Sequence, residues 1–334
     1  MWNVAQNNCW GCAVGRWSAT RNWLTISTPR RSMSMRGGSP MTELAKRVLT
    51  ALVGIPVFLL ALVGPPASVM PAGSTWVVLV MLIALMGMLE MLLAVEKRYP
   101  EVRVNRPLAM LSVYLPFDAW LGSQPQASFL ESIRLVVAAV VLVALAWEVW
   151  QAERLGKLGV WRNVGTAAFV VLYPGLLLGI WVKLRLIDAG CAGEGVWLSD
   201  GVRLILLTCV SMWVCDSAAY FVGKRFGRRR MSPRLSPRKS WEGAAAGTLL
   251  GTVAASLTAL GTGLPPVTAA VLALAAIVMG QAGDLFESAL KRELEIKDFG
   301  GFLPGHGGVM DRFDSLLFAL PVVYLLSHFL PICS

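Results

Sequence analysis

The chain has 334 residues, of which 56% are apolar and only 15% are charged, and its mean hydropathy is +0.62. Apolar runs long enough to cross a bilayer recur along it, which excludes an ordinary soluble protein and predicts an all-α, polytopic integral membrane protein with about nine transmembrane helices. The net charge of +10 does not indicate nucleic-acid binding, because the cations follow the pattern of membrane-protein loops.

Residues 1–40 differ in composition from the rest of the chain. They are rich in Trp, Asn, Ser and Arg, contain almost no acidic residues and lack a continuous apolar run. A secretory signal is disfavoured because no apolar core precedes residue 48. A transit peptide is one interpretation. We favour a mis-called or disordered extension, with Met41 as the true start.

The apolar segments predict transmembrane helices in two regions. N-terminal helices are expected within 41–172, and a catalytic region within 173–334, whose cytoplasmic loops cover 223–243 and 284–312. The third segment is the weakest because Pro107, Pro116 and Asp118 interrupt it. The predicted spans are 48–64, 75–95, 107–122, 135–151, 164–182, 203–222, 243–262, 265–283 and 313–332.

The lysines and arginines alternate between the two sides as the positive-inside rule requires when the N-terminus is cytoplasmic. This pattern places both charge-rich loops in the cytoplasm, where nucleotides are found, and the C-terminus outside. The opposite side keeps only Arg134, Lys183, Arg185 and Arg203. The cations expected in the cytoplasm are Lys46, Arg47, Lys97, Arg98, Arg103, Arg106, Arg154, Lys157, Arg162, those from Lys224 to Lys239, Lys291, Arg292, Lys297 and Arg312.

The stretch 283–314 is dense in ionisable residues although it lies between two apolar segments. Asp284 ends the eighth predicted span, and Asp311 and Asp314 open the ninth. If the helix continues past Asp284, positions i+3, i+4 and i+7 share a face with it. Carboxylates converging there would suit Mg²⁺. The alternative is that these acids only cap helices and pair with nearby cations. The positions i+3, i+4 and i+7 hold Glu287, Ser288 and Lys291.

The loop 223–243 carries more cations than membrane orientation requires. Arg228–Arg230 suit contact with anionic lipid. The second half presents hydroxyls and cations on a Pro-fixed turn just before a span, which suits a triphosphate. This half contains Ser236, Arg238, Lys239 and Ser240.

Four other ionisable residues have open interpretations. Asp216 lies inside a predicted span, where an acid is costly unless it is paired or near water. Glu90 and Glu148 raise the same question and are interpreted as structural or gating residues. His306 could be a metal ligand or general base, but a hydrogen bond to phosphate or plain loop packing fits its position equally well.

Two motifs with defined spacing lie in and beside these loops. One is Ser288-x-x-Lys291-Arg292, Lys297-Asp298, Gly300, Leu303-Pro304, His306-Gly307-Gly308, Asp311-Arg312 and Asp314. The other is Asp216-x-x-Ala219-Tyr220-x-x-Gly223-Lys224 with Ser236-Pro237-Arg238-Lys239-Ser240-x-Glu242-Gly243, and weaker matches are Glu90 and Tyr173 through Arg185. Together they closely resemble the signature of the phosphatidate cytidylyltransferase (CDP-diacylglycerol synthase) family. That family usually has lysine at the position of Arg238, which keeps the charge but changes its geometry.

The resemblance implies transfer of CMP from CTP to phosphatidic acid, giving CDP-diacylglycerol and pyrophosphate, by metal-assisted attack of the lipid phosphate on the CTP α-phosphate. It implies Mg²⁺, with K⁺ as a candidate second cation, a bacterial-type inner membrane, a cytoplasmic active site and a homodimer as a candidate assembly. Asp284 and Asp311 would be metal ligands, and Asp314, Lys291 and Arg292 would complete the catalytic set. The expected substrate-binding residues are Ser236, Arg238, Lys239, Ser240, Ser288, Lys297, His306, Arg312 and Asp216.

Two kinds of alternative compete with this interpretation. A polyprenol or phytol kinase, or a synthase for ether lipids, would also use CTP, but the complete His-Gly-Gly-x-x-Asp-Arg-x-Asp pattern argues against the kinases. If the chain were a transporter or an inactive lipid-binding scaffold, Glu90, Glu148 and Asp216 would line a path through the membrane region. A transporter site is expected near mid-membrane, whereas the charged motifs here cluster at the predicted interface, and no acid of the set is missing.

Overall fold

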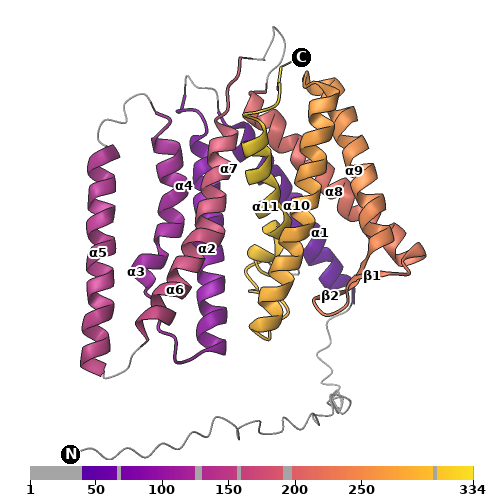
Figure 1. Ribbon diagram of the computed structural model, residues 1–334. Coiled ribbons are helices and arrows are strands. Elements are labelled where there is room, and N and C mark those ends of the chain that lie inside the picture. The colour runs from indigo at the N-terminus through magenta and orange to yellow at the C-terminus, as the bar shows by residue number, and fades with distance from the viewer. Residues whose placement is uncertain are drawn as a thin grey trace, which may run out of the picture. The chain divides into compact units, whose positions relative to one another are not determined.

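The computed structural model describes residues 40–65, 69–124, 130–155, 159–190, 198–303 and 307–333. The predicted N-terminal extension therefore lies outside the described residues, except that Pro40 begins the first helix. Most of the described chain is helical, in agreement with the predicted fold class, and a short β-hairpin adds to it (Figure 1).

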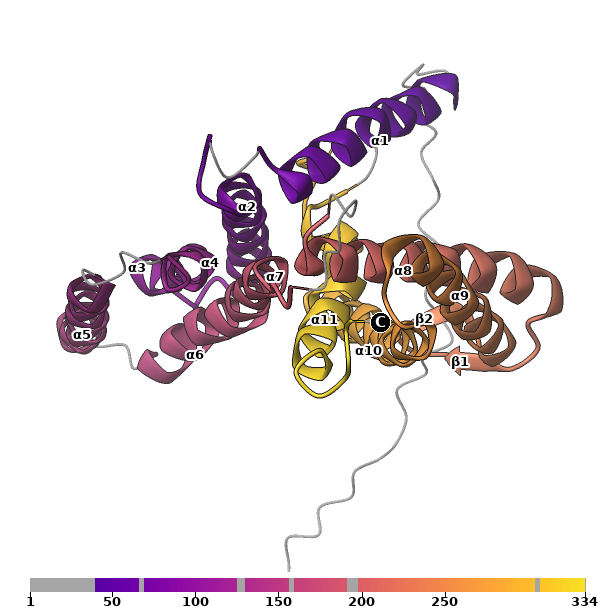
Figure 2. The ribbon, with the colours of Figure 1, turned by 90° about the horizontal axis from the view of Figure 1, so that it is seen from above.

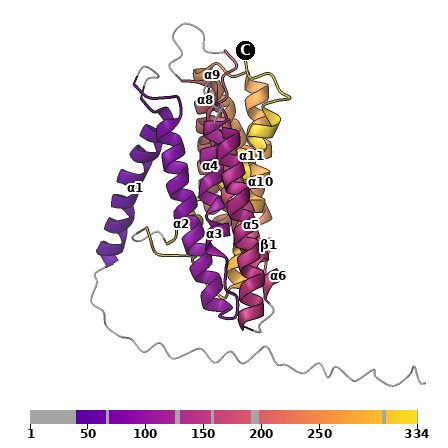
Figure 3. The same ribbon diagram turned by 90° about the vertical axis from the view of Figure 1, so that its left-hand side faces the viewer.

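The first two helices meet at one end and diverge toward the other (Figure 3). They are α1 (Pro40–Val63) and α2 (Ser74–Arg98). Where they meet, the Thr75 hydroxyl donates to the Ala61 carbonyl oxygen at 3.0 Å. The buried face of α2 contributes Trp76, Val80 and Ala84 to the apolar core.

The third apolar segment is interrupted, but at Met110 and not at the predicted Pro116 or Asp118, which lie inside a helix. This segment forms two short helices, α3 (Arg106–Ala109) and α4 (Leu111–Leu121), followed by α5 (Leu130–Leu155). Asn105 caps α3, because its side chain accepts from Leu108 N at 3.0 Å, and Pro107 follows in the first turn. Proline suits this position because the first helical N–H groups have no partner within the helix.

The next helical segment changes its hydrogen-bonding pattern in the middle. It consists of α6 (Val160–Val170), the π-helical turn η2 (Val171–Leu176) and α7 (Leu177–Arg185). Pro174 lies inside the turn and lacks the N–H that an α-helix would use there. Gly175 packs on α4, where a Cβ would lie 2.4 Å from Ser112 Cα. The turn therefore lets this segment bend and approach α4 closely.

The C-terminal part of the chain contains four long helices and the hairpin. These elements are α8 (Asp200–Phe226), β1 (Arg230–Ser232), β2 (Ser236–Ser240), α9 (Trp241–Thr262), α10 (Pro266–Glu293) and α11 (Met310–Leu326). The antiparallel strands pair Arg230 with Ser240 and Ser232 with Ser236. Helix α10 continues past the end of its predicted span, so the connection to α11 covers only 294–309.

Six helical segments of the described chain are long and apolar enough to cross a membrane. They are Ser74–Arg98, Glu131–Arg154, Val160–Arg185, Asp200–Phe226, Trp241–Thr262 and Pro266–Glu293, with Val48–Val63 as a shorter apolar helix. Many large apolar side chains on these helices are exposed, as lipid contact requires. The chain is thus a multi-pass membrane protein.

Small residues let α8, α9, α10 and α11 pack closely, and Figure 2 shows these helices side by side. A Cβ at Gly247 of α9 would lie 2.6 Å from the Cys215 carbonyl oxygen of α8. A Cβ at Gly283 of α10 would lie 2.7 Å from the Asp314 carbonyl oxygen of α11. Close backbone approach of this kind is common between membrane helices. At Gly283 it brings the neighbouring Asp284 beside Asp314.

Candidate active site

Five carboxylates gather where α8, α10 and α11 come together. Asp216 belongs to α8, Asp284 and Glu287 to α10, and Asp311 and Asp314 to the first turns of α11. Asp284 interacts electrostatically with both Asp216 and Asp314, and Glu287 interacts with both acids of α11. Glu287 is completely buried and Asp311 is only 9% exposed. Burying acids beside one another is unfavourable unless cations lie close to them.

Two lysines supply such cations from different elements. Lys239 on β2 forms an ion pair with Asp284, so the hairpin contributes directly to the site. Lys291 Nζ lies 3.0 Å from Glu287 Oε1 and 2.9 Å from Asp311 Oδ1, and joins α10 to α11. Five carboxylates against two ammonium groups leave an excess of negative charge when all are ionised. This composition can accept a further cation, while the lysines can contact phosphate.

The Asp311 carboxylate is held by the connection between α10 and α11. Its Oδ2 accepts from Phe299 N and from Gly308 N, each at 2.9 Å, while Oδ1 faces Lys291. A Cβ at Gly308 would lie 2.8 Å from Asp311 Oδ2, so only glycine allows this contact without displacement. The orientation of the carboxylate is therefore defined by three donors.

Glu90 of α2 holds the same connection from the other side. Its Oε1 accepts from Val309 N at 2.9 Å, and its Oε2 accepts from Met310 N at 3.0 Å. These N–H groups lie at the start of α11, which has no side-chain cap of its own. A carboxylate is favourable there because the helix N-terminus presents unpaired donors and partial positive charge. Glu90 thus fixes the turn that carries Asp311.

Two buried polar atoms beside the acids lack a hydrogen-bond partner among the described residues. They are the Tyr173 hydroxyl and Glu287 Oε2. The hydroxyl interacts electrostatically with Glu287, Asp311 and Asp314, so the π-helical turn η2 borders the site. Buried polar atoms usually have partners, and these two are suited to contact a bound group or water.

Comparison with known proteins shows the family of the chain. A model of the cytidylyltransferase family matches residues 45–330. The chain is also similar to the phosphatidate cytidylyltransferase of Bacillus subtilis, at 31% identity over 290 residues, which covers 86% of this chain and 98% of that protein. The chain belongs to the phosphatidate cytidylyltransferase family.

Two further relatives are similar to the chain over different lengths. The phosphatidate cytidylyltransferase of Staphylococcus epidermidis is 30% identical over 284 residues, which covers 84% of this chain and 97% of that protein. The Thermotoga maritima enzyme of the same name is 44% identical over 137 residues, which covers 39% and 51% of the two chains. Membership of this family makes the chain a nucleotidyltransferase.

Within this cytidylyltransferase fold, three of the other predicted residues lie next to the acids or the hairpin. Ser288 Oγ donates to Asp284 Oδ1 at 3.5 Å. Ser240 is buried as the N-cap of α9, where its Oγ accepts from Gly243 N at 3.2 Å. Arg292 Nε donates to the carbonyl oxygen of the hairpin residue Leu235 at 3.5 Å. These contacts join the hairpin, α9 and α10.

The remaining predicted residues do not contact the acids of the site. Their side chains are exposed or half-buried and make no hydrogen bond or ion pair with other described residues. His306 lies outside the described residues. The side chains without such contacts are those of Ser236, Arg238, Lys297 and Arg312.

Three residues at or beside the site were not predicted to act there. Glu287 belongs to the helical face expected after Asp284, so its spacing was a usable signal. Tyr173 and Glu90 carried weaker signals, because each is a single polar residue in an apolar segment. Glu90 was interpreted as structural or gating, and its contacts with Val309 and Met310 assign it a more specific position.

We expect Lys291→Met to destabilise the protein strongly. The substitution leaves Glu287 and Asp311 without their shared cation, and removing one partner of a buried ion pair costs about 3 kcal/mol or more. Thermal unfolding in detergent should therefore begin at a clearly lower temperature than in the unchanged protein. Lys97→Met, at an exposed site, is the control. Equal unfolding temperatures for the two variants would contradict the ion-pair assignment.

Proposed function

We propose that the chain transfers CMP from CTP to phosphatidic acid and releases CDP-diacylglycerol and pyrophosphate. Family membership and the names of the relatives support this activity. The observation that carries the proposal is a group of acids paired with two lysines: Asp284 with Lys239, and Glu287 and Asp311 with Lys291. Asp314 lies beside them and interacts electrostatically with both lysines. Such a group can serve a polar nucleotide while a lipid approaches from the bilayer.

Asp284 and Asp311 are the proposed ligands of Mg²⁺, which accepts carboxylate oxygens. No three His, Cys, Asp or Glu side chains in the described ranges are close enough to hold a metal ion together. Mg²⁺ commonly uses one or two carboxylates and completes its shell with water and substrate phosphates. The unpaired oxygen of Glu287 adds to the oxygen-rich surroundings. When bound, Mg²⁺ would neutralise phosphate charge, and K⁺ is a candidate second cation.

The protein's own residues address the main obstacle, which is bringing two anionic phosphates together. Lys239 and Lys291, which pair with acids of the group, would reduce this repulsion, and Arg292 contacts the adjoining hairpin turn. An oxygen of the lipid phosphate attacks the α-phosphorus of CTP, and the bond from that phosphorus to the bridging oxygen breaks as pyrophosphate leaves. The attacking oxygen is already anionic, so positioning and electrostatic stabilisation suffice without a covalent enzyme intermediate.

We further propose nine spans, with the N-terminus and the site in the cytoplasm of a bacterial-type cell. The distribution of lysine and arginine supports this orientation. A second observation is that Cys333, after α11, is disulfide-bonded and has its Sγ 3.9 Å from the Ala189 carbonyl oxygen. Disulfides persist in oxidising compartments, so this end of α11 is assigned to the outside.

The proposed reaction is tested with the purified full-length protein in detergent. CTP, Mg²⁺ and phosphatidic acid are supplied together and then omitted one at a time, while pyrophosphate and CDP-lipid are both measured. We expect the two products in equal amounts, and neither product when any component is absent. Pyrophosphate release that does not depend on the lipid would contradict the transferase proposal.

A further inference from the structure

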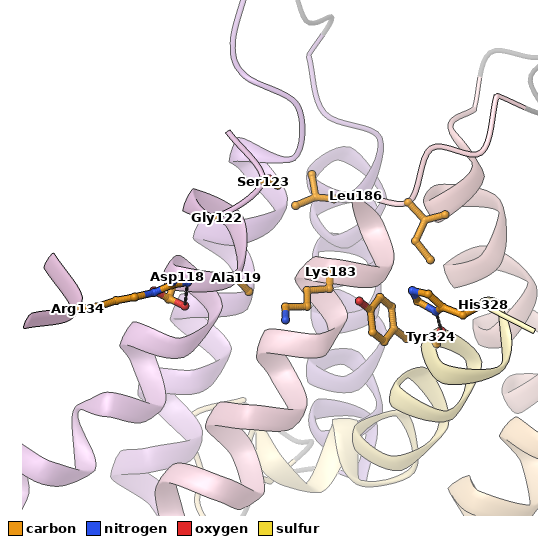
Figure 4. A pocket seen from close by; sticks show the side chains of 10 residues that line it. Asp118, Ala119, Gly122, Ser123, Arg134, Lys183, Leu186, Tyr324 and His328 are labelled. Carbon is orange, nitrogen blue, oxygen red and sulfur yellow. Dashed lines mark hydrogen bonds and ion pairs between the residues drawn. The ribbon is translucent and has the colours of Figure 1, made fainter. Parts of the chain in front are cut away.

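A cavity of about 410 Å³ lies at the opposite end of the helices from the acids. It is bordered by α4, α5 and α7 and by the end of α11 and the residues after it. Figure 4 shows Lys183 in the middle, with Asp118 and Arg134 on one side of it and Tyr324 and His328 on the other. Tyr324 is about 20 Å along α11 from Asp311, from the rise of 1.5 Å per residue. The cavity is therefore separate from the candidate active site.

Four cations depart from the positive-inside pattern, and three of them have partners that explain their position. Arg185 donates to the carbonyl oxygens of Leu62 and Val63, at 2.6 and 3.0 Å, and so caps α1. Arg203 pairs with Asp200 and donates to the Thr262 carbonyl oxygen. Arg134 forms two hydrogen bonds to Asp118, at 3.0 and 3.1 Å. Lys183 is the fourth.

Lys183 interacts electrostatically with Asp118 but has no direct partner within the described chain. Its side chain is exposed, makes no hydrogen bond or ion pair to a described residue, and points into the cavity (Figure 4). A cation on the outer side of a membrane protein opposes the orientation signal of the loops. Because Lys183 lines a cavity, binding of an anion there would explain why a lysine is present on this side.

The polar groups around Lys183 favour an anion over a cation or a neutral ligand. The one carboxylate, Asp118, already accepts from Arg134 and from the Tyr114 hydroxyl, the latter at 2.8 Å. The charges of Asp118 and Arg134 cancel, so the ammonium group of Lys183 leaves the cavity positive. The Tyr324 hydroxyl donates to no described residue and faces the same space.

We propose that this cavity binds the phosphate group of an anionic phospholipid in the leaflet opposite the acidic site. Lys183 supplies the charge, and the Tyr324 hydroxyl supplies a neutral donor. His328 Nδ1 lies 2.7 Å from the Tyr324 carbonyl oxygen and donates to it, which orients the ring beside Tyr324. Basic pockets between membrane helices bind anionic head groups on the cytoplasmic side, and the same charge pairing is proposed here for the opposite leaflet. The cavity is assigned independently of the proposed reaction.

The test uses the full-length protein in phosphatidylcholine nanodiscs with increasing fractions of phosphatidylglycerol. Lipids that stay bound after extraction are counted by native mass spectrometry. Loss of one charge-assisted hydrogen bond should weaken retention about tenfold in Lys183→Ala. Lys183→Arg should retain the lipid because it keeps the charge. Lys97→Ala, which removes an exposed lysine at the cytoplasmic end of α2, should also retain it.

Two results would overturn the proposal. One is equal retention of phosphatidylglycerol by Lys183→Ala and the unchanged protein. The other is binding of free inorganic phosphate in place of the lipid phosphate group. If inorganic phosphate alone binds with a dependence on Lys183, and phosphatidylglycerol is not retained, the cavity is a site for a soluble anion.

Discussion

Replacement of Asp311 by Asn should reduce the rate of CDP-lipid formation by about 10³-fold, the loss typical when one preorganised electrostatic contact is removed. The asparagine oxygen can still accept from Phe299 N and Gly308 N, so the connection between α10 and α11 should keep its path. The amide nitrogen would then face Lys291, where a carboxylate oxygen now lies 2.9 Å away. Two donors would then oppose each other and lower the unfolding temperature, but Lys291 keeps its ion pair with Glu287 at 3.0 Å. The variant is expected to fold while losing the negative charge proposed to hold Mg²⁺.

The measurement is kcat as a function of Mg²⁺ concentration, with thermal unfolding as a check on folding. Glu293→Gln, at an exposed position near the end of α10, is the matched control because it also removes one carboxylate. It should leave kcat and the Mg²⁺ dependence unchanged. An Asp311→Asn variant with nearly full kcat at the same Mg²⁺ concentration would place the metal site elsewhere.

We expect Glu90→Gln to lower activity by about 10- to 100-fold, the range for residues that orient a metal ligand. Glu90 accepts two backbone N–H groups, from Val309 and Met310. Glutamine offers only one oxygen, so its NH₂ group must face one of these donors. The start of α11 would shift, and the Asp311 carboxylate would move with it. The Mg²⁺ concentration for half-maximal activity should rise.

Glu148→Gln distinguishes positioning from a general effect on stability. Glu148 is also a buried acid in an apolar helix, and it accepts from Asn105 Nδ2 at 3.0 Å and Asn163 Nδ2 at 3.1 Å. Both variants should lower the unfolding temperature, but only Glu90→Gln should change the Mg²⁺ dependence. If the two variants change activity and Mg²⁺ dependence equally, Glu90 is a structural residue only.

Local features of this fold could be predicted from the sequence because their causes are local. Apolar runs identify the long helices, and Pro107 suits the first turn of α3, whereas Pro116 lies inside α4 and does not mark the break at Met110. The spacing from Asp284 to Lys291 was expected to form one helical face, and α10 does continue to Glu293. The acids of the eighth and ninth predicted spans were expected to lie close to one another. In the structure Asp284 interacts electrostatically with Asp314, and Glu287 with Asp311 and Asp314.

The long-range contacts could not be predicted in the same way. Glu90 bonds main-chain N–H groups about 220 positions away, and main-chain donors leave no residue signature. Lys239 was expected to bind phosphate, and its ion pair with Asp284 depends on a hairpin that the sequence did not indicate. Tyr173 interacts with the acids from η2, a π-helical turn that the sequence did not indicate. These contacts depend on how distant segments pack.

The most direct test of the central claim follows the two ends of the CTP triphosphate separately. Purified protein with phosphatidic acid and Mg²⁺ is given CTP labelled at the α-phosphate or, in a parallel reaction, at the γ-phosphate. Cytidylyl transfer predicts that the α-label enters the lipid product and the γ-label leaves in pyrophosphate. A γ-label in the lipid would instead show kinase chemistry and contradict the proposed reaction.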